Sequence, residues 1–163
     1  MALLPEPHLH ALRVIHGLLQ GQEGLVWALT GSTSFVLQGM DLLPHDIDLI
    51  TDVGGAYRIG EILSACVVKP VGSDSAAAYI RSHFGRFLVE GVEVDVMGSP
   101  RRMNLDGSWG EPDFLPPIIQ WIEFSDMRVP VLPLSYEAQA YRLLRRDGRA
   151  EEIEAFLEYK REK

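Results

Sequence analysis

Two aspartates separated by a single residue, Asp46 and Asp48, are the clearest chemical feature of this sequence. They belong to an alternating stretch, 46–50, that is typical of a strand. Because successive side chains of a strand point to opposite faces, both carboxylates project to the same side. Asp95 lies between two valines on another predicted strand. Converging carboxylates hold divalent metal ions that neutralise phosphate charge and align an attacking hydroxyl, so these aspartates are candidate catalytic residues and metal ligands.

A second candidate feature is the pair Gly31 and Ser32, which follows the short apolar run 25–29 and precedes a predicted helix. Where a strand turns into a helix, exposed backbone N–H groups and the positive helix end favour phosphate. The glycine allows close approach to the backbone. The Ser32 hydroxyl can cap the helix, contact phosphate, or do both. We therefore expect these two residues to bind a nucleotide.

Each of these signals is weak by itself, because an Asp-x-Asp pair is more often a solvated strand end than a functional site. Their order along the chain is much rarer. A strand, Gly31-Ser32, a helix, a strand bearing Asp46-Ile47-Asp48 and a later strand bearing Asp95 follow one another. The combination indicates one site built from distant segments.

In this order the sequence resembles the DNA polymerase β-like nucleotidyltransferase superfamily. The resemblance rests on Gly31-Ser32, thirteen intervening residues, Asp46-Ile47-Asp48, and Asp95 as the third carboxylate. Residues 27–35, 44–49 and 82–86 are similar to small bacterial members, including minimal and antibiotic-modifying types, and the pattern extends over most of residues 9–157.

The resemblance implies a metal-dependent enzyme that moves a nucleoside monophosphate from an NTP, such as ATP, to a hydroxyl acceptor and releases pyrophosphate. It implies that Gly31 and Ser32 contact the phosphates, and that the aspartates bind Mg²⁺ or Mn²⁺ while one of them assists deprotonation of the acceptor. The acceptor could be a small molecule, a protein or an RNA end. Relatives often carry a basic Arg-x-Lys-Asp stretch where this chain has residues 149–152, Arg-Ala-Glu-Glu. Nucleotide or acceptor contacts made there are therefore in doubt.

An alternative hypothesis keeps the fold without turnover. The chain would then act as an interaction protein, for example an antitoxin-like partner that binds a toxin-like protein, or as a nucleotide sensor. Three retained carboxylates favour the enzyme.

Hydrophobic periodicity predicts the elements that must position these residues. Helices are predicted over 9–19, 33–39, 56–66, 136–146 and 149–163, and strands over 25–29, 46–50, 79–89, 92–97, 118–124 and 128–132. Loops are predicted over 72–78 and 98–117. Ser135 is the predicted N-cap of the fourth helix and Gly148 its predicted end. The pattern favours an α/β (α+β) nucleotidyltransferase fold with a central mixed β-sheet flanked by helices. We expect a single domain over 1–163, with C-terminal helices from about 135.

Bulk composition narrows the function further. A length of 163 residues suits one domain, and a formal charge of -8 weighs against extended nucleic acid as a partner. Cys66 is the only cysteine, which excludes a zinc site made of thiolates. The start of the chain does not read as a secretion signal, and no apolar run is long enough to span a membrane. We expect a cytoplasmic protein.

Several polar residues near the expected site have ordinary alternatives as solvated loop or strand residues. Glu93 is predicted to share the face of Asp95 but to be exposed beside a hairpin, so it is left outside the catalytic set. The remaining candidates are His45 beside the first aspartate, the basic trio Arg81, His83 and Arg86, the loop pair Arg101-Arg102, and Trp109, which could stack on a base or sugar.

Overall fold

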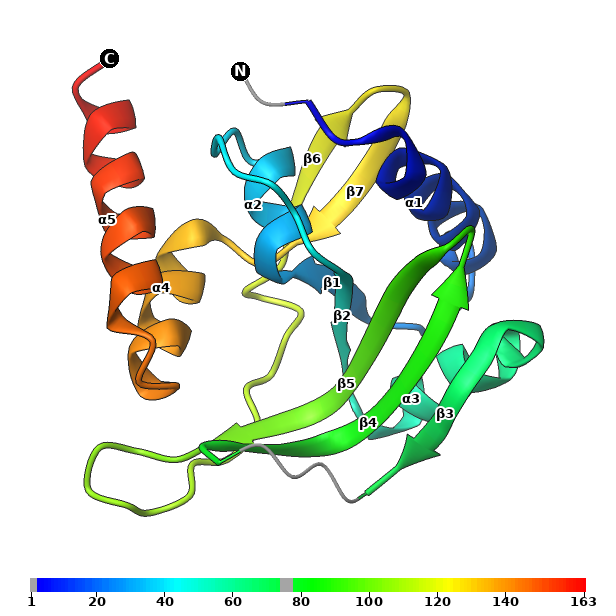
Figure 1. Ribbon diagram of the computed structural model, residues 1–163. Helices are drawn as coiled ribbons and strands as arrows, with labels where there is room; N and C mark the ends of the chain where they lie inside the picture. The colour runs from blue at the N-terminus through cyan, green and yellow to red at the C-terminus, as the bar shows by residue number, and fades with distance from the viewer. Residues whose placement is uncertain (1–2, 74–77) are drawn as a thin grey trace.

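The computed structural model describes residues 3–73 and 78–163 and contains a seven-stranded mixed sheet flanked by helices (Figure 1). This confirms the predicted α/β architecture. The strands are β1 Trp27–Thr30, β2 Ile47–Thr51, β3 Val67–Gly72, β4 Ile80–Val89, β5 Val92–Arg102, β6 Gln120–Phe124 and β7 Met127–Val131. The α-helices are α1 Glu6–Leu19, α2 Gly31–Leu37, α3 Val53–Ile62, α4 Leu134–Leu143 and α5 Asp147–Arg161, and a 3-10 turn covers Ser64–Cys66.

The strand order is β3-β4-β5-β2-β1-β7-β6. β2 pairs with β5 in parallel, whereas β1 pairs with β2 and β4 with β5 in antiparallel fashion. The register places Thr30 opposite Asp48, Asp48 opposite Asp95, and Asp95 opposite Arg86. These four residues form a row across β1, β2, β5 and β4. Directly paired residues of adjacent strands share a face, so the row lies on one face of the sheet, called here the carboxylate face.

The opposite face of the sheet is the core face, and α1 and α3 pack against it. Alternate residues of β2 and β5, such as Leu49 and Val96, are fully buried there together with Leu12 and Ile15 of α1. The spacing of the apolar residues in α1 gives the helix one apolar stripe, which this face covers. Burial of every second strand residue thereby fixes which side chains face the other way.

The carboxylate face is partly covered: α4 and α5 lie beside it (Figure 1), and Leu115, Ile118 and Ile119 pack in one cluster with Ala28 of β1 and Ile50 of β2. These helices pack against α2 through a small cluster that includes Phe35, Ala138 and Ile153. The ring of Phe35 meets the edge of Tyr141, with 5.7 Å between the ring centroids. Between α4 and the far part of the sheet, a cavity remains.

Two strand predictions need correction. β5 runs to Arg102, so the predicted loop over 98–117 begins later. Residues 98–102 of β5 were not predicted as strand because they are polar and include a proline. They pair with β4 across a bulge, where the register shifts between Arg81 and His83, and a bulge tolerates proline inside a strand. β3 was missed because an exposed edge strand shows no alternation, and the predicted loop over 72–78 overlaps its last residue. Residues 74–77 of that loop lie outside the described residues.

The helix boundaries near the C-terminus also differ from the prediction. α4 begins directly after Pro133, whose backbone angles already suit a helix start, so Ser135 lies inside the first turn and caps nothing. The chain reverses at Arg145, which has a positive φ of 61°. Gly148 therefore belongs to the first turn of α5 instead of ending α4. Within the described residues, no helix is both long and apolar enough to cross a bilayer.

Phe87→Ala tests this assignment of faces, because Phe87 is fully buried on the core face while its neighbour Leu88 is 52% exposed. Loss of a buried phenylalanine costs about 3–5 kcal/mol, whereas an exposed substitution stays within about 0.5 kcal/mol. We expect a large drop in the free energy of unfolding, measured in urea, for Phe87→Ala and almost none for Leu88→Ala. Equal losses would contradict the assignment.

Candidate active site

The three predicted aspartates come together on the carboxylate face. Carboxylate oxygens of Asp46, Glu93 and Asp95 lie within 4.8 Å of one another. Asp48 is paired directly with Asp95 in the register of β2 and β5. Glu93 was left out of the candidate set as an exposed hairpin residue, yet its side chain is only 38% exposed and joins the cluster. Sequence alternation placed it on the correct face, but the proximity of Asp46 depends on the parallel pairing of β2 with β5.

Asp48 requires a glycine at the neighbouring turn. Gly31 has a φ of 76°, a conformation that side chains other than glycine rarely adopt. A Cβ at this position would also collide with the Oδ2 of Asp48. The Gly31 backbone and the Asp48 carboxylate are therefore packed against each other.

Burial and the charges of neighbouring carboxylates act together on Asp48. Burial, followed by the charges of Asp95 and Asp46, raises its pKa from an ordinary 3.8 to about 8. The pKa of Glu93 is also raised, first by burial and then by its hydrogen-bonding contact with Asp46. The cluster thus carries more negative charge than its surroundings stabilise. An oxygen-rich, partly buried group of this kind fits Mg²⁺ or Mn²⁺.

Arg86 is the cation that contacts this cluster. Its Nε donates to Oδ1 of Asp95 at 2.8 Å and its Nη2 to Oδ2 at 3.2 Å, while Nε lies 3.4 Å from Oε1 of Glu93. The hydrogen bond with Asp95 is the main cause of a raised pKa for Arg86. The predicted basic trio is not assembled, because His83 contacts Tyr57 of α3 and Arg81 lies over the ring of Trp109.

The turn between β1 and α2 is held by several hydrogen bonds. The N–H of His45 donates to the Ser32 hydroxyl at 3.0 Å, and the Thr33 hydroxyl donates to the carbonyl oxygen of Asp46 at 2.7 Å. These contacts tie the start of α2 to the segment that carries the first aspartate. His45 therefore contributes its backbone to the site, and its side chain is exposed.

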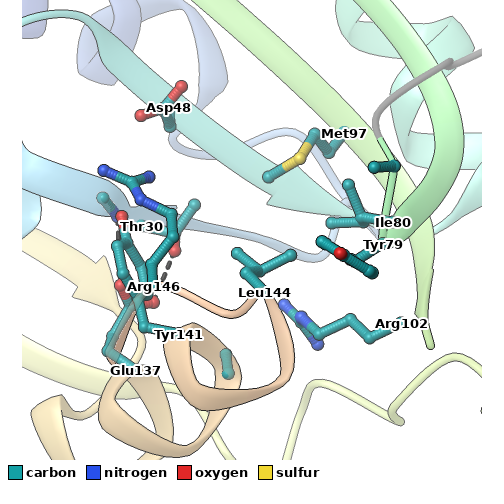
Figure 2. A pocket seen from close by; sticks show the side chains of 13 residues that line it. Thr30, Asp48, Tyr79, Ile80, Met97, Arg102, Glu137, Tyr141, Leu144 and Arg146 are labelled. Carbon is teal, nitrogen blue, oxygen red and sulfur yellow. Dashed lines mark hydrogen bonds between the residues drawn. The ribbon is translucent and has the colours of Figure 1, made fainter. Parts of the chain in front are cut away.

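A cavity of about 370 Å³ opens beside Asp48, between the sheet and α4 (Figure 2). Its volume falls in the range of small-molecule sites. Thr30, Gly31 and Asp48 lie at one end, and Tyr79, Ile80, Met97 and Arg102 line the β4–β5 side. From the C-terminal helices come Glu137, Ala140, Tyr141, Leu144 and Arg146. The helical residues were missed because their periodicity indicates packing and gives no sign of what they face.

Two arginines supply positive charge to this cavity. Arg146 points toward the end where Asp48 lies (Figure 2). Arg102 lies at the far end, where its Nη1 donates to the Tyr136 hydroxyl at 2.8 Å. Its Nε is buried without a hydrogen-bond partner in the described part of the chain. Of the predicted pair, Arg101 instead bonds the carbonyl oxygen of Gly110, outside the cavity.

Asp48→Asn tests, in metal-free protein, the cost of ionising Asp48 where it is buried beside other carboxylates. Because the pKa of Asp48 is raised by folding, wild-type stability falls as pH rises toward about 8 and stays low above it. Asparagine cannot ionise, so the variant should melt above the wild type at pH 9 by at least about 3 °C, the shift that roughly 1 kcal/mol produces in such a domain. The difference should shrink at pH 5. Thermal unfolding with a chelator measures both, and an unchanged or lower melting temperature at pH 9 would contradict the raised pKa of Asp48.

Comparisons with known proteins agree with this geometry. The profile of the aminoglycoside-2''-adenylyltransferase family matches residues 11–156. A crystal structure from Thermotoga maritima, of a protein described only provisionally as a nucleotidyltransferase, is 39% identical and superimposes with a TM-score of 0.81 over 99% of this chain and 97% of that one.

A more distant match is the lincomycin-bound structure of the lincosamide antibiotic adenylyltransferase LnuA. It shares the fold at 16% identity and a TM-score of 0.55, over 93% of this chain and 97% of that one. No curated protein matches the chain. The family match and the 39% identical structure confirm the resemblance read from the Gly-Ser and Asp-Ile-Asp motifs, and the chain belongs to the aminoglycoside-2''-adenylyltransferase family of nucleotidyltransferases.

Proposed function

We propose that this protein is a divalent-metal-dependent nucleotidyltransferase that moves a nucleoside monophosphate from an NTP to a hydroxyl acceptor and releases pyrophosphate. The observation that supports it most is the position of Asp48. It is paired with Asp95 across β2 and β5, packs against Gly31, and lines one end of the cavity. Family membership favours ATP as the donor.

The three aspartates would share one task in this mechanism, which is to bind the metal. Asp46, Asp48 and Asp95 would hold Mg²⁺ or Mn²⁺, with Glu93 at the edge of the group. The bound metal supplies charge neutralisation for the phosphates and the leaving pyrophosphate. Burial, and next the charges of Asp95 and Asp46, make the ionised form of Asp48 costly, and a bound cation would offset that cost.

The nucleotide would lie along the cavity from the Gly31 turn toward Arg102. Gly31 and Ser32 would face the triphosphate, and Arg146 points to the same end from the C-terminal side of α4 (Figure 2). The middle of the cavity is apolar, with Ile80 and Met97 among its walls, which suits a base and sugar. Arg146 would supply the positive charge that relatives carry in the stretch corresponding to residues 149–152.

The acceptor would approach from the other side of the carboxylates. Glu93 lies on β5 away from Met97, does not line the cavity, and is partly exposed next to Asp46. This acidic rim favours a small acceptor that carries amino groups as well as the reacting hydroxyl. The oxygen of the acceptor hydroxyl would bond to the α-phosphorus while the bond from that phosphorus to the oxygen that bridges it to the β-phosphorus breaks, which releases pyrophosphate. A carboxylate of this acidic rim would take the proton of the hydroxyl.

Asp48→Asn and Asp95→Asn test the assignment, with Asp41→Asn as the matched control because Asp41 is exposed and outside the cluster. We expect the first two variants to lose at least about 1000-fold in metal-dependent pyrophosphate release, since each removes a metal ligand from the reacting centre. The control should keep wild-type turnover. The assay would use Mg²⁺, each of the four NTPs and a panel of aminoglycoside and lincosamide acceptors, with product mass as a second readout.

Two results would count against the proposal. Full activity in Asp48→Asn would remove this residue from the mechanism. Nucleotide binding without pyrophosphate release for any acceptor would favour the alternative, a nucleotide sensor that keeps the fold without turnover.

A further inference from the structure

Glu137 of α4 is a fully buried carboxylic acid with 1% of its surface exposed. Both of its oxygens are engaged: Oε1 accepts from the Thr30 hydroxyl, and Oε2 accepts from the Gly31 N–H at 3.1 Å. Within the described residues it has no ion-pair partner. A buried carboxyl group is costly unless its hydrogen bonds are satisfied, so both of these contacts matter for its placement.

These two bonds join α4 to the turn where the nucleotide is proposed to bind. α2 and α4 also make apolar contacts, such as the edge-on contact of Phe35 with Tyr141. Apolar contacts tolerate sliding, whereas hydrogen bonds are directional. Gly31 also packs against Asp48, so a shift of the turn would move it relative to the metal-binding carboxylates.

We propose that Glu137 is a positioning residue for the nucleotide: it clamps Thr30 and Gly31 so that the phosphate-binding turn and the α4 wall of the cavity stay in register. The inference rests on the proposed function, because it assigns the triphosphate to this turn. Glu137 acts through the turn and is not itself a group that touches the reacting atoms.

The clamp has a pH signature. Burial raises the pKa of Glu137 to about 7, and the bonds from Thr30 and Gly31 partly oppose this rise. Glu137 interacts electrostatically with three charged or titratable groups. They are Arg102 of β5, Asp48 of β2 and Tyr141 of α4 itself. Below pH 7 the clamp is mainly neutral. Above pH 7 its negative charge faces the cavity and repels a triphosphate.

Glu137→Gln and Glu137→Ala separate the contacts from the charge. A glutamine can keep both contacts, since its carbonyl oxygen accepts from Gly31 and its amide donates to the Thr30 hydroxyl. Alanine keeps neither. Gln139→Ala is the matched control, because Gln139 is on the same helix but exposed. Steady-state KM and kcat for Mg-ATP are measured at pH 6 and pH 8.5.

At pH 6 we expect Glu137→Ala to raise KM for ATP about tenfold or more, with a smaller change in kcat, because two hydrogen bonds at the turn are lost. Glu137→Gln and the control should stay within about threefold of the wild type. At pH 8.5 Glu137→Gln should have a KM several-fold below that of the wild type, because it lacks the repelling charge. A wild-type KM in Glu137→Ala at pH 6, or the same pH dependence of KM in wild type and Glu137→Gln, would overturn the clamp.

A measurement without nucleotide distinguishes failure of this inference from failure of the proposed function. Amide hydrogen exchange at Gly31 should be about tenfold faster or more in Glu137→Ala, and unchanged in Gln139→Ala. If the wild type neither binds nor transfers any nucleotide, the proposed function fails, while Gly31 exchange still tests the clamp. Unchanged protection of Gly31 in Glu137→Ala overturns the clamp alone. If Glu137→Ala does not fold, Thr30→Val removes one of the two bonds and is measured in its place, with the same expectations at smaller size.

Discussion

Burial of neighbouring carboxylates together on one face of the sheet is the constraint on which the proposed site depends. Asp48 and Asp95 are direct neighbours across β2 and β5, and Asp46 and Glu93 extend the same group. The strands keep them together because every second residue is buried against α1 and α3 on the core face. Burial of apolar side chains on the core face thereby offsets the cost of holding these carboxylates close together.

Partial compensation comes from the surroundings of the cluster. Arg86 forms a two-pronged contact with Asp95, so the charge of that aspartate is balanced without metal. Asp48 has no such partner among the described residues, and it shows the largest rise in pKa within the group. Asp48 is also the aspartate against which the Gly31 backbone packs, so the proposed metal site and the proposed phosphate-binding turn are adjacent. The raised pKa, the contact with Gly31 and the pairing with Asp95 all involve Asp48.

Much of this arrangement could be predicted from the sequence. Alternation in residues 46–50 predicts that the side chains of Asp46 and Asp48 lie on the same face of the sheet. The order of the motifs indicated the nucleotidyltransferase family that the family match confirms. The identities of the three aspartates and the Gly31-Ser32 turn required no coordinates. Their roles in binding metal and nucleotide remain proposals.

Other parts of the site depend on pairings that no local pattern encodes. The edge strand β3 and the bulged end of β5 lack periodicity, so the extent of the sheet was underestimated. Glu93 lay on the predicted face, but only the register of β2 with β5 brings it to Asp46. Glu137 is more than a hundred residues from the turn it contacts, and its sequence context is that of an ordinary helix.

We propose that metal and nucleotide meet between these aspartates and the Gly31 turn. A crystal grown with Mn²⁺ and a non-hydrolysable ATP analogue tests it most directly, through the anomalous signal of manganese. We expect manganese bound by oxygens of Asp46, Asp48 and Asp95, with the triphosphate against Ser32 and the base in the cavity beside α4. Manganese or nucleotide bound elsewhere, with these aspartates free of both, would contradict it.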